Sequence, residues 1–388
     1  MLVLIIIILW FISAFFSFGF LGLTYLWLKR MANRPWNIKV DKSFMPKVSI
    51  IVPTYNEERA ITYKIRNLTK LKYPKDLVQI IFVDGCSADS TVEKIKAFIQ
   101  GNKTMNIQLI TENKRAGKSA SLNSTLKNCQ GDIIIVSDAD CFWPSTILEK
   151  AIPYLADSRV GAISGPKKLL NTGFSYAVNS EVSYLETMNL MKLGESKISS
   201  TLLFEGGFSA FKREVLGSFD PYDTGSDDCG TIIGVIEKNF KTIMVPEAEF
   251  YTFFPKTLGG KLEMKVRRAG QLIRVFKKYA VLLLRGGMKN ERWIIVKNLL
   301  TYFLAPFAFL AFIITSLYMV FKFTATSLTL LILLIPKVRS YFFEVSLGYV
   351  VILYAMVLSI LRKNFVIWKQ PEDRFLLNQE CLIENDLV

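Results

Sequence analysis

The stretch from residue 131 to residue 140 reads GDIIIVSDAD, and the expected fold and chemistry both start from it. Four consecutive aliphatic residues predict a strand that is buried on both faces of a parallel sheet. Asp138 and Asp140 follow at the carboxyl end of that strand, where alternation points both side chains the same way. Two such carboxylates can share a divalent cation, and oxygen ligands favour Mg2+ or Mn2+. The alternative is a strand end followed by a solvated turn.

Residues 46–255 show the alternating pattern of a single α/β domain. Short aliphatic runs alternate with helical patterns, which predicts a doubly wound, mostly parallel sheet. Ligands of such folds bind beyond the carboxyl ends of the strands, which is where Asp138 is expected. The predicted strands are 48–52, 79–83, 107–110, 133–136 and 160–164, and the predicted helices are 58–71, 90–100, 118–128 and 145–155.

An apolar run over residues 2–28 is long enough to span a bilayer. No basic residue precedes it, whereas Lys29, Arg30 and Arg34 follow it. The positive-inside rule therefore predicts an outward amino terminus and a cytosolic domain. A cleaved signal peptide would need a basic start, a shorter apolar core and a small-residue cleavage site, which this run lacks. We therefore expect residues 1–30 to be a transmembrane anchor.

Apolar segments return after the α/β domain. Residues 298–321 and 341–361 are each long enough to cross a membrane, while 323–336 is short. The region 297–363 is therefore expected to hold two or three transmembrane helices, and a polar, peripheral tail is expected over 364–388. With the anchor, this predicts a multi-pass protein of the cell membrane whose catalytic domain is cytosolic.

Charge and residue usage narrow the chemistry further. Of the net charge of +15, +10 lies between Lys256 and Lys297, where twelve Lys or Arg stand against two Glu. Because this segment borders predicted membrane helices, an anionic lipid surface explains it better than nucleic acid does. The chain has no histidine, so acid–base work must fall to carboxylates. The five cysteines show neither metal-ligand spacing nor an even disulfide framework, so we expect free thiols.

Polar segments follow the other predicted strands. Pro53 ends the first strand ahead of TYNEE, and Asp84 ends the second. The basic segment 113–123, NKRAGKSASLN, opens a helix and suits a diphosphate. Gly206 and Gly207 would let the backbone approach a ligand. Each feature also has a plainer explanation as a helix cap or a solvated turn.

An acid pair, Asp227 and Asp228, precedes the apolar helical pattern at 231–239. Adjacent like charges raise the pKa of at least one carboxyl group, which suits a carboxylate base. Alternatively, two acids at the start of a helix complement its dipole.

Six motifs, taken in order, resemble those of glycosyltransferase family 2 enzymes of GT-A fold over about residues 47–275. They are VPTYNE, VDGCSADST, RAGKSASLN, SDAD, EGGFSAFKRE and SDDCG. The resemblance implies a UDP- or GDP-sugar donor and a divalent cation. It implies that Asp228 is the base, with Asp227 in place of the family's glutamate. By the same resemblance the donor residues are Pro53, Tyr55, Glu57 and Asp84 at the nucleoside, Lys118 at the diphosphate, and Asp138 with Asp140 at the metal.

One family feature is missing. Membrane members that polymerise sugars usually carry Gln-x-x-Arg-Trp shortly after the base, and the two candidate segments here end in Ala269 and Val275. Neither supplies an aromatic platform for an acceptor sugar. The surrounding region 256–296 is predicted to form basic amphipathic helices at the membrane interface. The candidate acceptor or phosphate ligands are Gly206, Gly207, Arg267, Arg268, Gln271 and Arg274.

These features predict a membrane-anchored, metal-dependent, inverting transferase. It would move one sugar from a nucleotide-sugar donor to a lipid or lipid-linked acceptor at the cytosolic membrane face. A processive polysaccharide synthase with a modified acceptor motif is the alternative enzyme. An inactive relative that binds nucleotide or lipid is the alternative outside catalysis, and the presence of Asp138, Asp140 and Asp228 argues against it.

Overall fold

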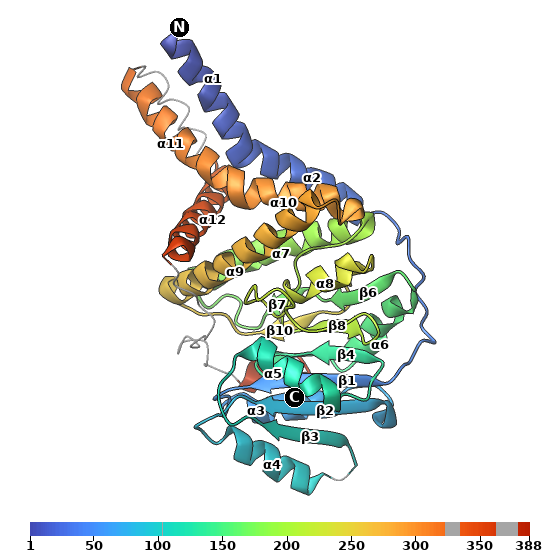
Figure 1. The fold of residues 1–388 in the computed structure, drawn as a ribbon. Helices are drawn as coiled ribbons and strands as arrows, with labels where there is room; N and C mark the ends of the chain where they lie inside the picture. Colours follow the sequence, from blue (N-terminus) through green and yellow to red (C-terminus); the bar gives the residue numbers. More distant parts are fainter. Residues whose placement is uncertain (103, 323–333, 362–378) are drawn as a thin grey trace.

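The computed structural model describes residues 1–102, 104–322, 334–361 and 379–388. Within these ranges, the centre of the molecule is a seven-stranded sheet in the order β3-β2-β1-β4-β8-β6-β9 (Figure 1). Its strands are parallel except β8, which runs antiparallel between β4 and β6. The predicted mostly parallel sheet is confirmed. The strands are β1 Val48–Thr54, β2 Val78–Asp84, β3 Asn106–Thr111, β4 Ile133–Val136, β6 Val160–Ser164, β8 Ser209–Lys212 and β9 Lys241–Met244.

Side chains of the central strands alternate between two hydrophobic cores. Ile50 and Ile135 pack on one face, together with residues of α3 and α6. Ile51 and Ile134 pack on the other face, with Leu122 of α5. Burial on both faces explains why these strands read as continuous aliphatic runs. The helices around the sheet are α3 Ile61–Thr69, α4 Thr91–Gly101, α5 Lys118–Thr125, α6 Ile147–Ala151 and α8 Thr231–Glu237.

The sequence did not predict the long helix α7 (Tyr176–Ile198). Lys192 and Glu195 on its inner face are only 2% and 1% exposed, and each pairs with a charged partner from another segment. An apolar stripe is the usual sequence signal of a helix that packs on a core, and a helix that buries ionic groups does not show a clear one. A second sheet, in the order β5-β10-β7, was also not predicted. Its strands are β5 Cys141–Phe142, β7 Lys167–Leu169 and β10 Phe250–Thr252.

Three helical segments among the described residues are long and apolar enough to cross a membrane: Val3–Ala32, Lys289–Lys322 and Tyr341–Ile360. They fall where the sequence predicted spans. Of the short apolar segment predicted at 323–336, residues 323–333 lie outside the described residues. The helices in these segments are α1 Leu2–Ala14, α2 Phe20–Ala32, α10 Arg292–Leu299, α11 Ala305–Lys322 and α12 Pro336–Ile360, and short π-helical stretches at Phe15–Gly19 and Leu300–Leu304 join α1 to α2 and α10 to α11.

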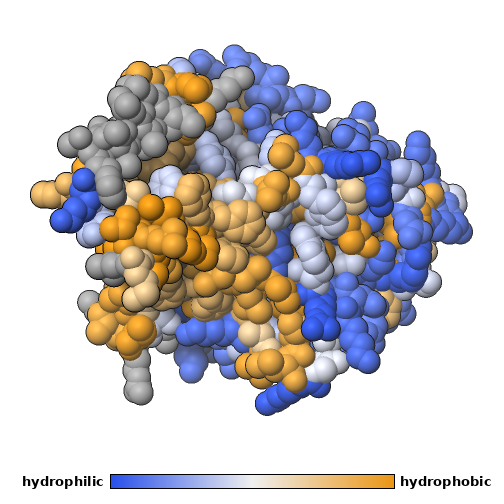
Figure 2. All heavy atoms as spheres, turned by 90° about the horizontal axis from the view of Figure 1, so that it is seen from above, coloured by the Kyte–Doolittle hydropathy of each residue, from blue (hydrophilic) through white to orange (hydrophobic). Residues whose placement is uncertain are grey.

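Helices α1 and α11 run side by side away from the α/β domain (Figure 1). Trp10 of α1 donates a 2.8 Å hydrogen bond to the Ser316 hydroxyl of α11. Outward side chains such as Phe11 and Phe307 are 62% and 55% exposed. Seen from that end, hydrophobic residues gather on these helices while much of the remaining face is hydrophilic (Figure 2). Such an exposed apolar surface is typical of membrane contact.

Helix α9 (Leu258–Leu284) lies between the α/β domain and the apolar helices (Figure 1). Ile273 packs against Tyr349 of α12, while Phe276 packs in a separate cluster with Ile233 of α8. The amphipathic helix predicted here is therefore in contact with protein on two sides.

The C-terminal residues return to the α/β domain. Leu382 of α13 (Gln379–Glu384) and Leu387 are buried in a cluster with Phe142. Asn67 of α3 donates a 2.6 Å hydrogen bond to the Leu387 carbonyl. The tail was expected to be polar and peripheral, and the structure differs over residues 379–388, because two leucines there bury apolar surface.

Candidate active site

A cavity of about 1000 Å³ opens at the carboxyl ends of β1 and β4. It continues between α7 and α9 as far as Glu344, Gly348 and Ile352 of α12. It thus joins the edge of the sheet to an apolar helix. The predicted site residues that line it are Pro53, Tyr55, Glu57, Lys118, Asp138, Asp140, Gly206, Gly207, Asp227, Asp228, Arg267, Arg268 and Gln271. Asp84 and Arg274 are the predicted site residues that do not.

The end of β1 and the loop after it line part of the cavity. The Arg115 guanidinium lies 3.7 Å from the centre of the Tyr55 ring, so the basic segment after β3 meets the loop after β1. Asp84 was predicted to contact the donor, but its carboxylate faces inward. It accepts hydrogen bonds from the Thr54 hydroxyl (3.0 Å), the Ser87 amide (2.8 Å) and the Ser87 hydroxyl (2.6 Å). In this structure Asp84 therefore holds the turns after β1 and β2.

Asp138 and Asp140 lie at the end of β4, as the sequence predicted. One carboxylate oxygen from each and the Cys141 sulfur lie within 4.8 Å of one another. Two carboxylates at this spacing fit Mg2+ or Mn2+, whereas a buried thiol is a poor ligand for such hard cations. A Cβ on Gly206 would lie 3.0 Å from both Asp138 Oδ2 and Lys118 Nζ. The missing side chain of Gly206 therefore leaves room beside the acids.

Lys64 of α3 supports the loop that carries these acids, a role that was not predicted from the sequence. Its fully buried ammonium donates hydrogen bonds to the Ser137 hydroxyl and the Cys141 carbonyl, both at 2.6 Å. It also lies 4.4 Å from the centre of the Trp143 ring. Burial lowers the pKa of Lys64 to about 7, against the opposing effect of nearby acidic groups. A lysine in an amphipathic helix is normally solvated, which is why the pattern did not identify it.

Gly207 was predicted to let the backbone approach a ligand. Packing against protein is enough to explain why this position has no side chain. A Cβ at this position would lie 2.2 Å from the Phe250 ring. Its carbonyl accepts a 2.8 Å hydrogen bond from the Trp143 indole. Gly207 lines the cavity, but its close approach is to protein.

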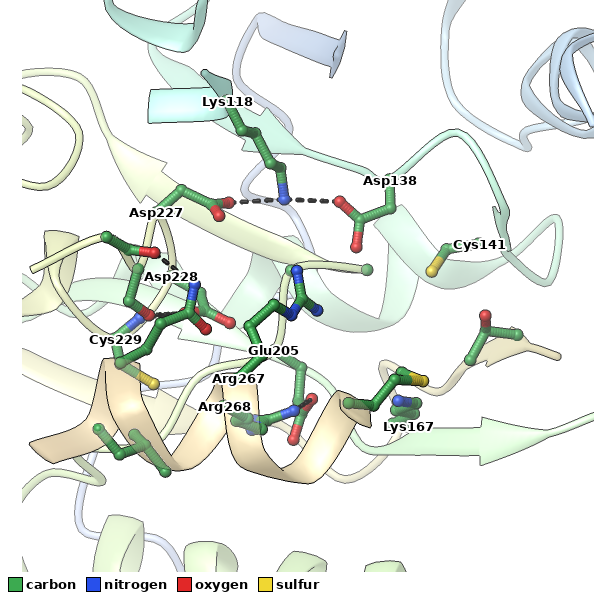
Figure 3. A pocket seen from close by; sticks show the side chains of 18 of the residues that line it. Lys118, Asp138, Cys141, Lys167, Glu205, Asp227, Asp228, Cys229, Arg267 and Arg268 are labelled. Carbon is green, nitrogen blue, oxygen red and sulfur yellow. Dashed lines mark hydrogen bonds and ion pairs between the residues drawn. The ribbon is translucent and has the colours of Figure 1, made fainter. Parts of the chain in front are cut away.

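Lys118 connects Asp138 of the candidate metal site to Asp227 of the acid pair. Its ammonium lies 2.6 Å from Asp138 Oδ1 and 2.6 Å from Asp227 Oδ2 (Figure 3). Burial acts to lower the pKa of Lys118, but the two carboxylates raise it overall, so the ammonium is charged. Burial raises the pKa of Asp227 to about 6, with Asp228 and Asp138 acting in the same direction and Lys118 opposing them.

Asp228 is held separately from Asp227. Its Oδ1 accepts hydrogen bonds from the Ser226 hydroxyl and from the Cys229 amide, the latter at 2.6 Å. The two acids thus have different partners: Asp227 contacts a lysine, and Asp228 contacts its own loop. Both line the cavity.

The part of the cavity toward the apolar helices is rich in charge. Glu205 is buried and accepts hydrogen bonds from Lys192 (2.7 Å) and Arg268 (2.8 Å). Although burial acts to raise its pKa, Arg268 and Lys192 hold the pKa of Glu205 well below its usual range. Arg267 extends from α9 into the cavity (Figure 3). Sequence reasoning missed Lys192 because the helix that carries it was not predicted.

The contact of Gln271 and Arg274 with an acceptor or its phosphate stays a prediction. In the structure, Arg274 Nε donates a 2.5 Å hydrogen bond to the Thr224 carbonyl, and Gln271 Nε2 donates to the Gly225 carbonyl. Both side chains therefore contact the loop that carries the acid pair.

Comparisons with known proteins agree with this geometry. Residues 49–219 match the model of glycosyl transferase family 2. The solved mannosyltransferase PcManGT from Pyrobaculum calidifontis, in complex with GDP-Man and Mn2+, is 26% identical. It superimposes with a TM-score of 0.78 over 92% of this chain and 100% of that chain.

Two curated relatives are similar over shorter stretches. An N-acetylglucosaminyltransferase of Rhizobium meliloti is 25% identical over 248 residues, which is 61% of this chain and 58% of that protein. A beta-monoglucosyldiacylglycerol synthase of Synechocystis sp. is 31% identical over 131 residues, which is 34% of this chain and 27% of that protein. The chain thus spans less than two thirds of the length of these curated relatives.

The GT-A-like sheet and these similarities define a glycosyltransferase. Residues 49–219 match glycosyl transferase family 2, the family that the six motifs resemble.

Proposed function

We propose that this glycosyltransferase moves one sugar from a nucleotide-sugar donor to a lipid or lipid-linked acceptor at the cytosolic face of a membrane. One observation carries the proposal: a single cavity runs from Tyr55 and Asp138 at the sheet edge to Ile352 on an apolar helix. A donor at the strand ends and an acceptor held in the bilayer could therefore meet in one space. Lys29 and Arg30, directly after the first apolar segment, support a cytosolic position of the domain.

The donor end of the cavity suits a UDP- or GDP-sugar with Mg2+ or Mn2+. Asp138 and Asp140 would hold the cation, which would offset the negative charge of the diphosphate. Lys118 would add a second positive charge there, and Tyr55 and Glu57 line the space for the nucleoside. The structural relative with GDP-Man and Mn2+ supports this choice of donor class and cation.

The reaction needs one base. In our proposal Asp228 takes the proton from the acceptor hydroxyl while the oxygen of that hydroxyl attacks the anomeric carbon of the donor sugar. The new carbon–oxygen bond forms on the face opposite the leaving group, and the bond to the nucleoside diphosphate breaks with its electron pair on the phosphate oxygen. One displacement of this kind inverts the anomeric configuration. Lys118 stabilises the charge that grows on the diphosphate.

The acceptor end suits a lipid with an anionic headgroup, such as a phosphate. Five basic side chains line that part of the cavity, compared with three acidic ones, Glu181, Glu205 and Glu344. The basic side chains are Lys167, Lys192, Lys265, Arg267 and Arg268. Arginine binds phosphate oxygens with paired N–H groups. The Synechocystis relative, named for a diacylglycerol product, supports a lipid acceptor.

The experiment is a donor panel with a product analysis. Purified protein in detergent is incubated with individual UDP- and GDP-sugars, Mn2+ or Mg2+, and a membrane lipid extract, and the lipids are analysed by mass. We expect one lipid species heavier by a single sugar. A ladder of sugars, or a polymer without a lipid-linked product, would favour the synthase instead. Donor binding without any turnover would favour an inactive relative.

A further inference from the structure

The loop at residues 220–230, which carries Asp227 and Asp228, has a strained backbone. Asp220 and Asp223 adopt positive φ angles of 46° and 51°, and Gly225 has φ 78°. Non-glycine residues adopt this region at a free-energy cost and persist there only where their surroundings hold them. The loop must therefore be fixed by contacts strong enough to offset that cost.

Some of these contacts come from within the loop and from the first residue of α8, which follows it. The Asp220 carboxylate accepts hydrogen bonds from the Thr224 amide (2.9 Å), the Thr224 hydroxyl (2.7 Å) and the Gly225 amide (2.7 Å). The Thr231 hydroxyl donates a 2.6 Å hydrogen bond to the Asp227 carbonyl. These bonds fix part of the loop from its own side chains and from α8.

Two consecutive backbone carbonyls of the loop accept hydrogen bonds from side chains of α9. Arg274 reaches the Thr224 carbonyl and Gln271 reaches the Gly225 carbonyl. The fit is close, because a Cβ on Gly225 would lie 2.6 Å from the Arg274 guanidinium. Positions three apart lie on one side of a helix, so the two side chains contact the loop together.

Helix α9 is itself a fixed support. Ile273, beside Arg274 in the chain, is 1% exposed and packs with Phe309 of α11 and Tyr349 of α12. The same helix therefore contacts the apolar helices and the loop that carries the acid pair.

We propose that Gln271 and Arg274 are positioning residues that hold the Asp227–Asp228 loop in place for the reaction, and that they do not bind the acceptor. The proposal rests on the proposed role of Asp228 as the base. Gln271 lines the cavity, but its side-chain amide donates to the Gly225 carbonyl. Arg274 does not line the cavity, whereas Arg267, two turns earlier on α9, extends into it. The two arginines therefore do different work: Arg267 faces the substrate space and Arg274 faces the loop.

The test compares Gln271→Leu, Arg274→Gln and Arg274→Lys with Lys277→Gln, an exposed position on the same helix. The donor is the nucleotide sugar identified by the panel, and the acceptor is the membrane lipid extract. We expect kcat to fall about 100-fold in Gln271→Leu and Arg274→Gln, the loss caused by a misplacement of about 1 Å. Acceptor KM and donor affinity should stay within about twofold of wild type. Arg274→Lys should regain part of kcat, and Lys277→Gln should match wild type.

A rise in acceptor KM with unchanged kcat would assign these residues to the acceptor and overturn the proposal. An unchanged kcat in both variants would overturn it equally. A second measurement does not need turnover: amide hydrogen exchange over residues 220–230 should quicken in both variants and not in Lys277→Gln. Protected amides in all variants would contradict the proposal even if the wild-type protein transfers no sugar. Absence of transfer by the wild type would contradict the proposed function instead.

Discussion

At Lys118, one ammonium group contacts carboxylates from two distant parts of the chain, Asp138 and Asp227. These contacts tie the candidate metal site to the acid pair before any ligand is bound. A donor diphosphate that binds Lys118 would compete with both carboxylates, and a cation at Asp138 would lessen that competition. The metal and the donor should therefore bind with positive cooperativity, each raising the affinity for the other.

The first prediction concerns the metal. Changing Asp138 or Asp140 to Ala should abolish the part of donor binding that EDTA removes, because each change deletes an oxygen ligand. Titration of the nucleotide sugar with Mn2+ and with EDTA measures this. Asp132→Ala, an exposed acid near the same strand, is the control and should behave like wild type. Turnover that is unchanged in EDTA would contradict the prediction.

The second prediction concerns the base. Asp228→Asn should lower the rate of transfer by about two to four orders of magnitude, the usual contribution of a general base. Donor affinity should change little, since Asp228 has no contact with Lys118. Asp227→Asn should have a smaller effect on the rate, measured in the same transfer assay. If Asp227→Asn proves the more damaging variant, the two acids have exchanged roles.

The third prediction concerns pH. The pKa of Asp227 is raised to about 6, so this carboxyl is anionic above that pH and neutral below it. Its ion pair with Lys118 is therefore present above pH 6 and lost below. If the pair keeps the site in order, the transfer rate should fall as the pH drops through about 6. In Asp227→Asn this step should disappear from a rate profile recorded between pH 5 and 8, and an unchanged profile would contradict the role of the pair.

Among the elements, the C-terminal residues have the least expected position. Asn67 binds the carbonyls of both Leu387 and Trp143, at 2.6 Å and 2.7 Å. Trp143 follows the candidate metal acids closely in the chain. The C-terminal segment 379–388 therefore braces the back of the loop that carries Asp138 and Asp140.

The fourth prediction tests this brace. Leu382→Ala, at a fully buried position, should lower the free energy of unfolding of the α/β domain by about 2 to 5 kcal/mol, the range for buried leucines. Thermal unfolding followed by tryptophan fluorescence measures the change. Ile383→Ala, on the same helix but 57% exposed, is the control and should have little effect. Equal stability of the two variants would mean that this segment does not support the domain.

At the scale of the whole molecule, the three apolar segments found among the described residues would determine which side of a membrane the α/β domain faces. The basic residues after the first segment predict the cytosolic side. Among the cysteines, Cys86 is exposed, whereas Cys129, Cys141 and Cys229 are buried and Cys381 is partly covered. Because its thiol is accessible, chemical labelling of Cys86 can show on which side of the membrane the α/β domain lies.

The fifth prediction uses this thiol. A membrane-impermeant maleimide should label Cys86 in inside-out vesicles and not in right-side-out vesicles. Labelling is read from the mass of the protein, and Cys86→Ser identifies any signal from Cys381. Labelling of Cys86 in right-side-out vesicles would place the domain outside.

The sequence by itself determined the parallel core, the apolar segments and the place of the Asp138–Asp140 pair. Strands buried on both faces and long apolar helices each leave a local pattern, and that pattern is readable without contacts. The sequence also identified Asp227 and Asp228 as a candidate site, because this acid pair stands just before an apolar helical pattern.

The tertiary structure alone decided the partners of charged groups. Lys64, Lys192 and Glu205 are buried because distant segments supply hydrogen bonds and opposite charge, and no local pattern encodes a distant partner. For the same reason Gln271 and Arg274 were assigned to a ligand, although they bind loop carbonyls 46 and 50 residues earlier in the chain. The sequence showed which groups carry charge, and only the packed fold determined what each charge meets.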